Sequence, residues 1–199
     1  MGNASFFESD TGILVRRRAI LAGTGVLSAG ALALLGGCEA LAAGPRKGAS
    51  AVVADPQADV RILNTALGAE LEAVAAYQVG AESGLLQKDV LNLAVGFQGH
   101  HKEHAEALAA TIEKLGGRPV AARDRYDFPV DKLKTQADVL RFAAGLEKGA
   151  VSAYLGAVPL FGARELAKVA ASILGDEAMH WAVLRHALGE DPVPVAFVS

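Results

Sequence analysis

Four stretches of this 199-residue chain repeat apolar side chains at helical spacing, alternately four and three residues apart. These stretches cover residues 57–83, 89–115, 136–158 and 163–188, and each is followed directly by a glycine or a proline, residues that end helices. The links after the first and third stretches are short, whereas about eighteen residues, 118–135, separate the second from the third. The pattern predicts an all-α, antiparallel four-helix bundle with one long crossover between the second and third helices.

The apolar face of each predicted helix is interrupted near its middle by carboxylates or imidazoles. In chain order these residues are Glu70, His101, His104, Glu147, Glu177 and His180. Tyr77 and Tyr154 each follow one of the glutamates, Glu70 or Glu147, by seven residues. The chain thus repeats one hairpin, in which Glu-x6-Tyr is followed by His-x-x-His or Glu-x-x-His. Two such hairpins facing each other bring all six groups together near the middle of the bundle.

Each group alone has an ordinary explanation, since a single buried Glu or His is often ion-paired or hydrogen-bonded and a tyrosine is often a core aromatic. Six together are costly, because burying an ion costs several kcal/mol unless it is paired. Bound cations satisfy all six, and carboxylate with imidazole suits iron, manganese or zinc. The six are therefore predicted metal ligands. Tyr77 and Tyr154 are predicted catalytic residues, as hydrogen-bonding groups behind the ligands or as one-electron donors.

The first 38 residues have the layout of an export signal, a basic segment followed by an apolar, Gly- and Ala-rich run. The sequence RRAIL at 17–21 is typical of a twin-arginine signal, and LGGC at 35–38 is typical of a lipobox that lipidates Cys38. A membrane-spanning anchor and a cut after ALA at 40–42 are the alternatives. The expected location is the periplasm or the outer face of the cytoplasmic membrane, with a lipid anchor.

The rest of the chain divides into three parts. Residues 39–55 are small, Gly- and Ala-rich, and predict a flexible tether. Residues 56–190 hold the bundle, in which the YDFP sequence at 126–129 is expected to lie along the helices. Residues 191–199 contain two prolines and predict an extended tail.

The composition limits the kinds of partner that the protein is expected to bind. A net charge of −3, without a basic cluster beyond one arginine triplet, predicts no basic surface for nucleic acid. A single cysteine excludes a disulfide framework and a cysteine-only zinc site. The expected partners are metal ions, the twin-arginine export machinery and, through the lipid anchor, a membrane. Monomer and homodimer both stay open.

Over residues 57–189 the chain resembles the ferritin-like superfamily, which includes ferritins, bacterioferritins and rubrerythrins. The resemblance is carried by Glu-x6-Tyr at Glu70 and Glu147, by Glu177-x-x-His180, and by the HAE sequence at 104–106. The YDFP segment resembles an exported bacterial branch related to desiccation-induced plant proteins. The superfamily resemblance implies a di-iron site that handles Fe(II), O₂ or peroxide, whereas activity is not a property of the whole exported branch.

The chain departs from the ferritin-like pattern at His101, where the pattern has glutamate. The replacement removes one negative charge and one bridging carboxylate, which weakens a symmetric di-iron centre more than metal binding itself. Three interpretations follow. The first is an exported oxidoreductase with iron or manganese in a dinuclear site. The second is a non-catalytic envelope or stress protein with a degenerate site or one structural ion. The third is an interaction module that binds a membrane partner.

Overall fold

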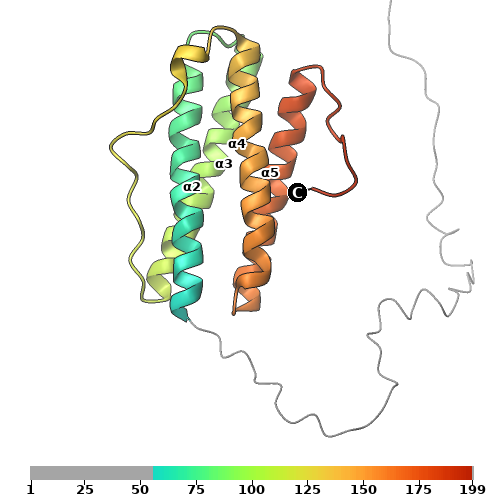
Figure 1. Cartoon of the computed structure of the whole chain (residues 1–199). Helices are drawn as coiled ribbons and strands as arrows, with labels where there is room; N and C mark the ends of the chain where they lie inside the picture. Colours follow the sequence, from blue (N-terminus) through green and yellow to red (C-terminus); the bar gives the residue numbers. More distant parts are fainter. Residues whose placement is uncertain (1–55, 199) are drawn as a thin grey trace, which may run out of the picture. The chain divides into compact units, whose positions relative to one another are not determined.

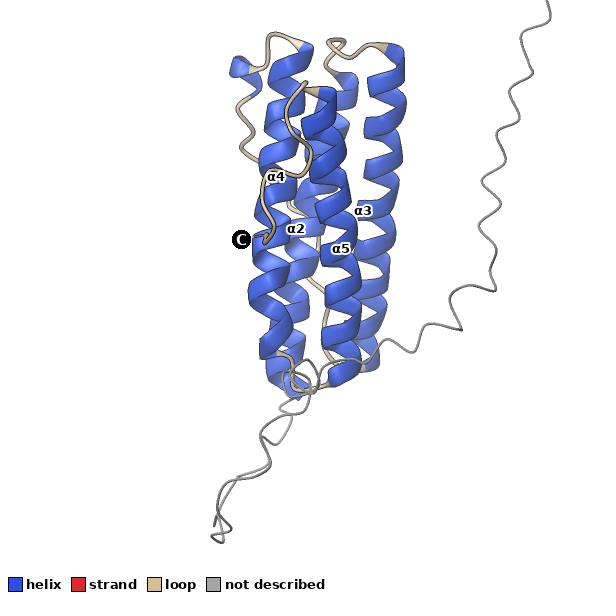
Figure 2. Ribbon diagram, turned by 90° about the vertical axis from the view of Figure 1, so that its right-hand side faces the viewer, coloured by secondary structure: helices blue, strands red, loops and turns tan. Residues whose placement is uncertain are grey.

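The computed structural model describes residues 56–198, and this part of the chain forms a bundle of four long helices without any strand (Figures 1 and 2). The long helices are α2 (Pro56–Glu82), α3 (Lys88–Lys114), α4 (Gln136–Ala157) and α5 (Arg164–Ala187). Two short 3₁₀ turns, η1 (Val130–Lys132) and η2 (Val158–Leu160), lie before and after α4. The all-α four-helix prediction is confirmed, with each helix limit within one residue of the predicted one. The predicted signal, Cys38 and the tether lie outside the described residues.

The helix limits follow from local chemistry. Thr135 and Asp138 form a capping box at the start of α4, in which the Asp138 N–H donates to Thr135 Oγ1 at 3.2 Å and the Thr135 N–H donates to Asp138 Oδ2 at 2.9 Å. Gly116 and Gly189, just after α3 and α5, have φ of +76° and +74°. Because side chains strain this left-handed conformation, glycine is the residue that ends a helix there.

Helices α2 and α3 form one antiparallel hairpin, and α4 and α5 form the other (Figure 1). Helix α2 also packs against α4, and α3 against α5, so that the order around the bundle is α2, α3, α5, α4. The α2/α4 face and the α3/α5 face are therefore opposite sides of the bundle. The crossover returns from the end of α3 to the start of α4 beside α2, so α3 and α4 run parallel, as expected (Figure 1).

The crossover is fastened to the bundle at both ends. Near its start, the Asn64 side chain donates to the Arg118 carbonyl at 3.1 Å and accepts from the Val120 N–H at 2.7 Å. Near its end, the Phe128 ring stacks on Tyr126 with centroids 5.6 Å apart and meets Phe142 of α4 edge-on at 5.7 Å. These contacts confirm that the YDFP segment lies along the helices.

The core consists of two apolar clusters, one toward each end of the bundle. The cluster near the start of α2 contains Val60, Leu63, Leu67, Ala105, Leu108, Ile112, Tyr154, Ala170 and Ile173. The other contains Tyr77, Phe97, Leu140, Ala143, Ala144 and Leu184. The buried glutamates and histidines lie between them, as the interrupted apolar faces predict. None of the described helices combines the length and the apolar character needed to cross a membrane.

Candidate metal centre

The structure brings the six predicted ligands together between the two apolar clusters. They come from all four helices: Glu70 from α2, His101 and His104 from α3, Glu147 from α4, and Glu177 and His180 from α5. Five of them are at most 2 % exposed, and the His104 side chain is 15 % exposed. Two overlapping groups of four have ligand atoms within 4.8 Å of one another, and both groups contain His101 and Glu177.

His101 lies in the centre of this cluster. Its Nδ1 is 2.8 Å from Glu70 Oε2 and 3.6 Å from Glu177 Oε1, while its Nε2 is 3.3 Å from Glu147 Oε1. The imidazole therefore occupies the place between the carboxylates of α2 and α4. Its Nδ1 contacts Glu70, which belongs to one group of four, and its Nε2 contacts Glu147, which belongs to the other.

Glu177 connects the two groups through its two oxygens. Its Oε1 is 3.2 Å from His104 Nδ1, and its Oε2 is 3.9 Å from His180 Nδ1. His180 Nδ1 is also 3.6 Å from Glu147 Oε1. A carboxylate placed in this way has one oxygen for each of two ions.

Several of these atoms have no hydrogen-bond partner among the described residues. They are His104 Nδ1, Glu147 Oε2, Glu177 Oε1, Glu177 Oε2 and His180 Nδ1. Buried polar atoms are almost always hydrogen-bonded, because an unmade bond costs about 1–3 kcal/mol. All five unsatisfied atoms are lone-pair donors of the kinds that iron, manganese and zinc bind. The donor set thus fits a metal.

Each tyrosine of the Glu-x6-Tyr repeat contacts the glutamate of the other hairpin. The Tyr154 hydroxyl donates to Glu70 Oε1 at 2.6 Å, and the Tyr77 hydroxyl donates to Glu147 Oε1. Burial and the neighbouring glutamates raise the pKa of both tyrosines well above the usual range, which keeps both hydroxyls protonated. The two crossed bonds fix the carboxylates of α2 and α4 from behind and follow the internal repeat of the sequence.

Protons balance the charges of the metal-free cluster. Burial raises the pKa of Glu70, but the adjacent α3 histidines outweigh burial and lower it to about 2. Burial lowers the pKa of His101 and His104, yet the adjacent carboxylates raise these values to about 10 and about 9. Burial and the charge of Glu147 raise the pKa of Glu177 above its usual range. At neutral pH two imidazolium groups therefore face two carboxylates.

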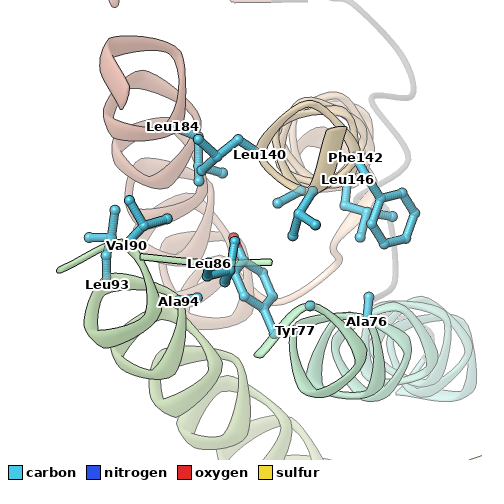
Figure 3. A pocket seen from close by; sticks show the side chains of 13 residues that line it. Ala76, Tyr77, Leu86, Val90, Leu93, Ala94, Leu140, Phe142, Leu146 and Leu184 are labelled. Atoms are coloured by element: carbon cyan, nitrogen blue, oxygen red, sulfur yellow. The ribbon is translucent and has the colours of Figure 1, made fainter. Parts of the chain in front are cut away.

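The end of the bundle next to Tyr77 is apolar. A pocket of about 20 Å³ lies there, and Tyr77 is the one residue of its lining with a polar side chain (Figure 3). Leu140, Leu184 and Val90, from three other helices, line it (Figure 3). This volume is about that of a single water, and its apolar walls offer a water no partners beyond Tyr77. The Tyr77–Glu147 bond is thus shielded from this end.

A much larger cavity reaches the centre from the α2/α4 face. It measures about 580 Å³, and its mouth includes the exposed residues Thr65 and Leu160. Its floor includes the buried Glu70, His101 and Glu147. Half of the residues that line it are alanine or glycine, which are too small to fill the space between the two helices. The volume lies within the range of small-molecule sites, so the cavity offers a route to the ligands.

The structure adds Asp176, which the sequence analysis did not single out. Asp176 Oδ2 is 3.4 Å from His104 Nε2 and 3.3 Å from His180 Nε2, the ring nitrogens that face away from the inner carboxylates. It is also 3.0 Å from His100 Nδ1. Asp176 lies one residue off the apolar face of α5, so the helical spacing does not select it. The one feature of the sequence that points to Asp176 is its position directly before Glu177, a predicted ligand.

Polar residues beside the apolar faces divide into three kinds. His100 contacts His180 behind the predicted ligands, and Glu103 is exposed. Gln98 is instead buried away from the ligands, where its amide donates to the Val74 carbonyl at 3.0 Å and thereby ties α3 to α2. His186 is exposed near the end of α5.

Comparison with solved structures supports the same fold. The chain is similar to a conserved hypothetical protein from Mycobacterium tuberculosis, with a TM-score of 0.62 and 22 % identity over 71 % of this chain and 97 % of that one. It is also similar to a protein from Bacillus anthracis described as ferritin-like and diiron-carboxylate, with a TM-score of 0.59 and 20 % identity over 67 % and 96 % of the two chains. No curated protein matched the sequence. The sequence profile of the ferritin-like domain matches residues 58–190, and the chain therefore belongs to the ferritin-like domain family.

Proposed function

We propose that the buried cluster binds one or two divalent ions of iron or manganese, and that the loaded protein oxidises Fe(II) or disposes of peroxide. The observation that carries this proposal is the convergence of the five unsatisfied ligand atoms between the two apolar clusters. A fold with a net stability of about 5–15 kcal/mol does not readily tolerate so many unmet buried groups. A bound cation satisfies them directly.

Glu177, His104 and His180 would hold the metal with atoms that have no hydrogen-bond partner among residues 56–198. Asp176 would accept the Nε2–H of both histidines, which leaves each Nδ1 with its lone pair directed inward. A carboxylate behind a ligating histidine is the common way to fix its tautomer and orientation. Glu70 and Glu147 would complete the donor set, each oriented by a tyrosine of the opposite hairpin.

Bound iron or manganese would supply one-electron steps toward O₂ or peroxide, which amino-acid side chains do not supply well. The protein would hold the ligands in a layer shielded by apolar residues on both sides. The 580 Å³ cavity would give a small oxidant access from the α2/α4 face. His101 takes part in binding only as a neutral imidazole, so a metal must displace its proton.

The test is the metal content of the purified chain after anaerobic loading with Fe(II) or Mn(II). The control is the isosteric variant Glu147→Gln/Glu177→Gln. One or two ions per wild-type chain, lost in the variant, would support the proposal and justify assays with O₂ and peroxide. No stoichiometric metal in either protein would contradict it.

One observation favours a second candidate, a non-catalytic ferritin-like envelope or stress protein. His101 bridges Glu70 and Glu147 at 2.8 Å and 3.3 Å, so that part of the centre is satisfied without metal. Under this candidate a single structural ion occupies the side of Glu177 and His180. A metal content of one ion per chain with no redox activity toward O₂ or peroxide would favour it.

We also propose that residues 1–38 export the folded protein and that Cys38 is lipidated. The twin-arginine and lipobox sequences support this proposal. The test is the mass of the processed amino terminus, together with membrane fractionation of Cys38→Ser. Lipid at Cys38, and release of the variant from the membrane, are expected; a mass that corresponds to cleavage after residue 42 would contradict lipidation.

A further inference from the structure

A second cluster of side chains that could hold a metal ion lies on the α3/α5 face and shares His180 with the buried centre. His100 Nδ1 is 2.9 Å from His180 Nε2 and 3.0 Å from Asp176 Oδ2, and Asp176 Oδ2 is 3.3 Å from His180 Nε2. The three atoms form a nearly equilateral triangle. Two imidazoles and one carboxylate are donors that suit zinc, iron and manganese.

The dimensions of this triangle match a common metal ion. Donors about 2.1 Å from one ion lie about 3.0 Å apart at right angles and about 3.4 Å apart in a tetrahedron. The three separations, 2.9, 3.0 and 3.3 Å, fall at these values. The stacking of Phe97 on the His180 ring, with centroids 4.0 Å apart, fixes the plane of that ring.

His180 belongs to both clusters through its two ring nitrogens. Its Nε2 faces His100 and Asp176, whereas its Nδ1, which has no hydrogen-bond partner among the described residues, faces Glu147 and Glu177. A neutral imidazole binds a metal through one nitrogen and carries a proton on the other. His180 therefore serves one cluster at a time.

Exposure falls steadily along this line of residues. The His100 side chain is 49 % exposed, that of Asp176 is 22 % exposed and that of His180 is 2 % exposed. A cation from solvent meets His100 and Asp176 first and then His180. On this face the three side chains thus form a line from the solvent to the interior of the bundle.

We infer that His100, Asp176 and His180 form an outer binding site for a divalent cation, which passes to the buried centre when His180 exchanges its Nε2 for its Nδ1 as the coordinating atom. No electrons move in this step; His180 transfers its ring proton from Nδ1 to Nε2, where Asp176 accepts the hydrogen bond. The hand-over rests on the proposed function, since it requires a centre that binds metal. The outer site itself does not.

The test uses Zn²⁺ alone and the full chain, with histidine ring nitrogens observed by long-range ¹H–¹⁵N NMR. Glu147→Gln/Glu177→Gln disables the buried centre, and His100→Ala disables the outer site. His186→Ala removes an exposed histidine elsewhere on α5 and is the matched control. We expect the glutamine variant to bind one Zn²⁺ through His100 Nδ1 and His180 Nε2. Adding His100→Ala should weaken this binding at least about tenfold, whereas His186→Ala should leave it unchanged.

In the otherwise wild-type chain, His100→Ala should slow the uptake of Zn²⁺ into the buried centre without lowering the final content. Since His100 is half-exposed, this comparison stands even if the glutamine variant is unstable. A glutamine variant that binds no Zn²⁺, or binds it with His100 unshifted, would overturn the outer site. Uptake by His100→Ala at the wild-type rate would overturn the hand-over. Zn²⁺ retained by the glutamine variant, with no Zn²⁺, Fe(II) or Mn(II) in the wild-type centre, would refute the proposed function and leave the outer site standing.

Discussion

The hydroxyl of Tyr154 on α4 donates a 2.6 Å hydrogen bond to Glu70 on α2, the glutamate of the other hairpin. Tyr77 makes the reciprocal bond to Glu147. The two repeated hairpins are therefore joined by reciprocal hydrogen bonds, in which the tyrosine of each hairpin orients the glutamate of the other. The tyrosines are thus positioning residues for the centre, whether or not they also transfer electrons.

Removal of one hydroxyl should weaken both the fold and the metal site. Tyr154→Phe leaves a buried carboxylate oxygen without its donor, and hydrogen bonds to charged groups contribute about 1.5–3 kcal/mol. We expect a loss of that size in the free energy of unfolding of the metal-free protein, and metal affinity about 10–100-fold lower. Urea unfolding and metal titration measure the two effects. Tyr126→Phe, in the crossover, is the control, and an affinity equal to wild type in Tyr154→Phe would contradict the positioning role.

Substitution of His101 by glutamate should lower the stability of the metal-free protein and raise its affinity for metal. His101→Glu removes the cation between Glu70 and Glu147 and adds a fourth carboxylate, so like charges repel in the metal-free protein. Two divalent cations would offset that repulsion. We expect a lower thermal midpoint than wild type with chelator and a larger rise on addition of Mn(II). A midpoint that is unchanged with chelator would show that His101 carries no charge in the folded protein.

The metal-free protein should be most stable in mildly acidic solution. The pKa of His101 rises from 6.5 to about 10 on folding, so above pH 6.5 the folded state keeps a proton that the unfolded state has lost, and the free energy of unfolding falls as pH rises. For Glu70, lowered from 4.5 to about 2, stability is lost as pH falls below 4.5. Urea midpoints measured with chelator from pH 4 to pH 10 should peak between these limits. A midpoint that climbs from pH 7 to pH 10 would contradict these shifts.

Much of the fold and most of the centre follow from periodicity alone. Apolar spacing locates the four helices, because burial on one helix face imposes a period that glycine and proline then end. The same period predicts that Glu70 and Glu177 lie in the core, since both occupy apolar positions. It does not predict Asp176, which lies beside that face, because its role depends on the direction in which the His104 and His180 rings turn. Side-chain rotation leaves no trace in sequence spacing.

Filling the cavity on the α2/α4 face should slow the reaction without removing metal. Ala73→Leu and Ala150→Leu each place a larger side chain in the lining of the 580 Å³ cavity. We expect slower Fe(II) oxidation by O₂ at unchanged metal content, measured by stopped-flow absorbance. Ala171→Leu, on the exposed side of α5, is the control. Equal rates in all four proteins would show that the oxidant arrives by another route.

Asp59 should prove a determinant of stability far from the metal centre. It is 3 % exposed in the first turns of α2 and accepts hydrogen bonds from the Gly162 and Ala163 N–H groups at 2.8 Å and 3.2 Å, just before α5. It thereby holds the turn between α4 and α5 with a side chain of α2, and joins the start of the first hairpin to the turn of the second.

Because a hydrogen bond to a charged group contributes about 1.5–3 kcal/mol, Asp59→Ala should lower the free energy of unfolding by about that amount. Asp59→Asn keeps one acceptor oxygen and should lose less. Urea unfolding, followed by the fluorescence of the single tryptophan, Trp181, measures both variants. Equal losses in the two variants would show that the negative charge at the start of α5, rather than the pair of hydrogen bonds, provides the stabilisation.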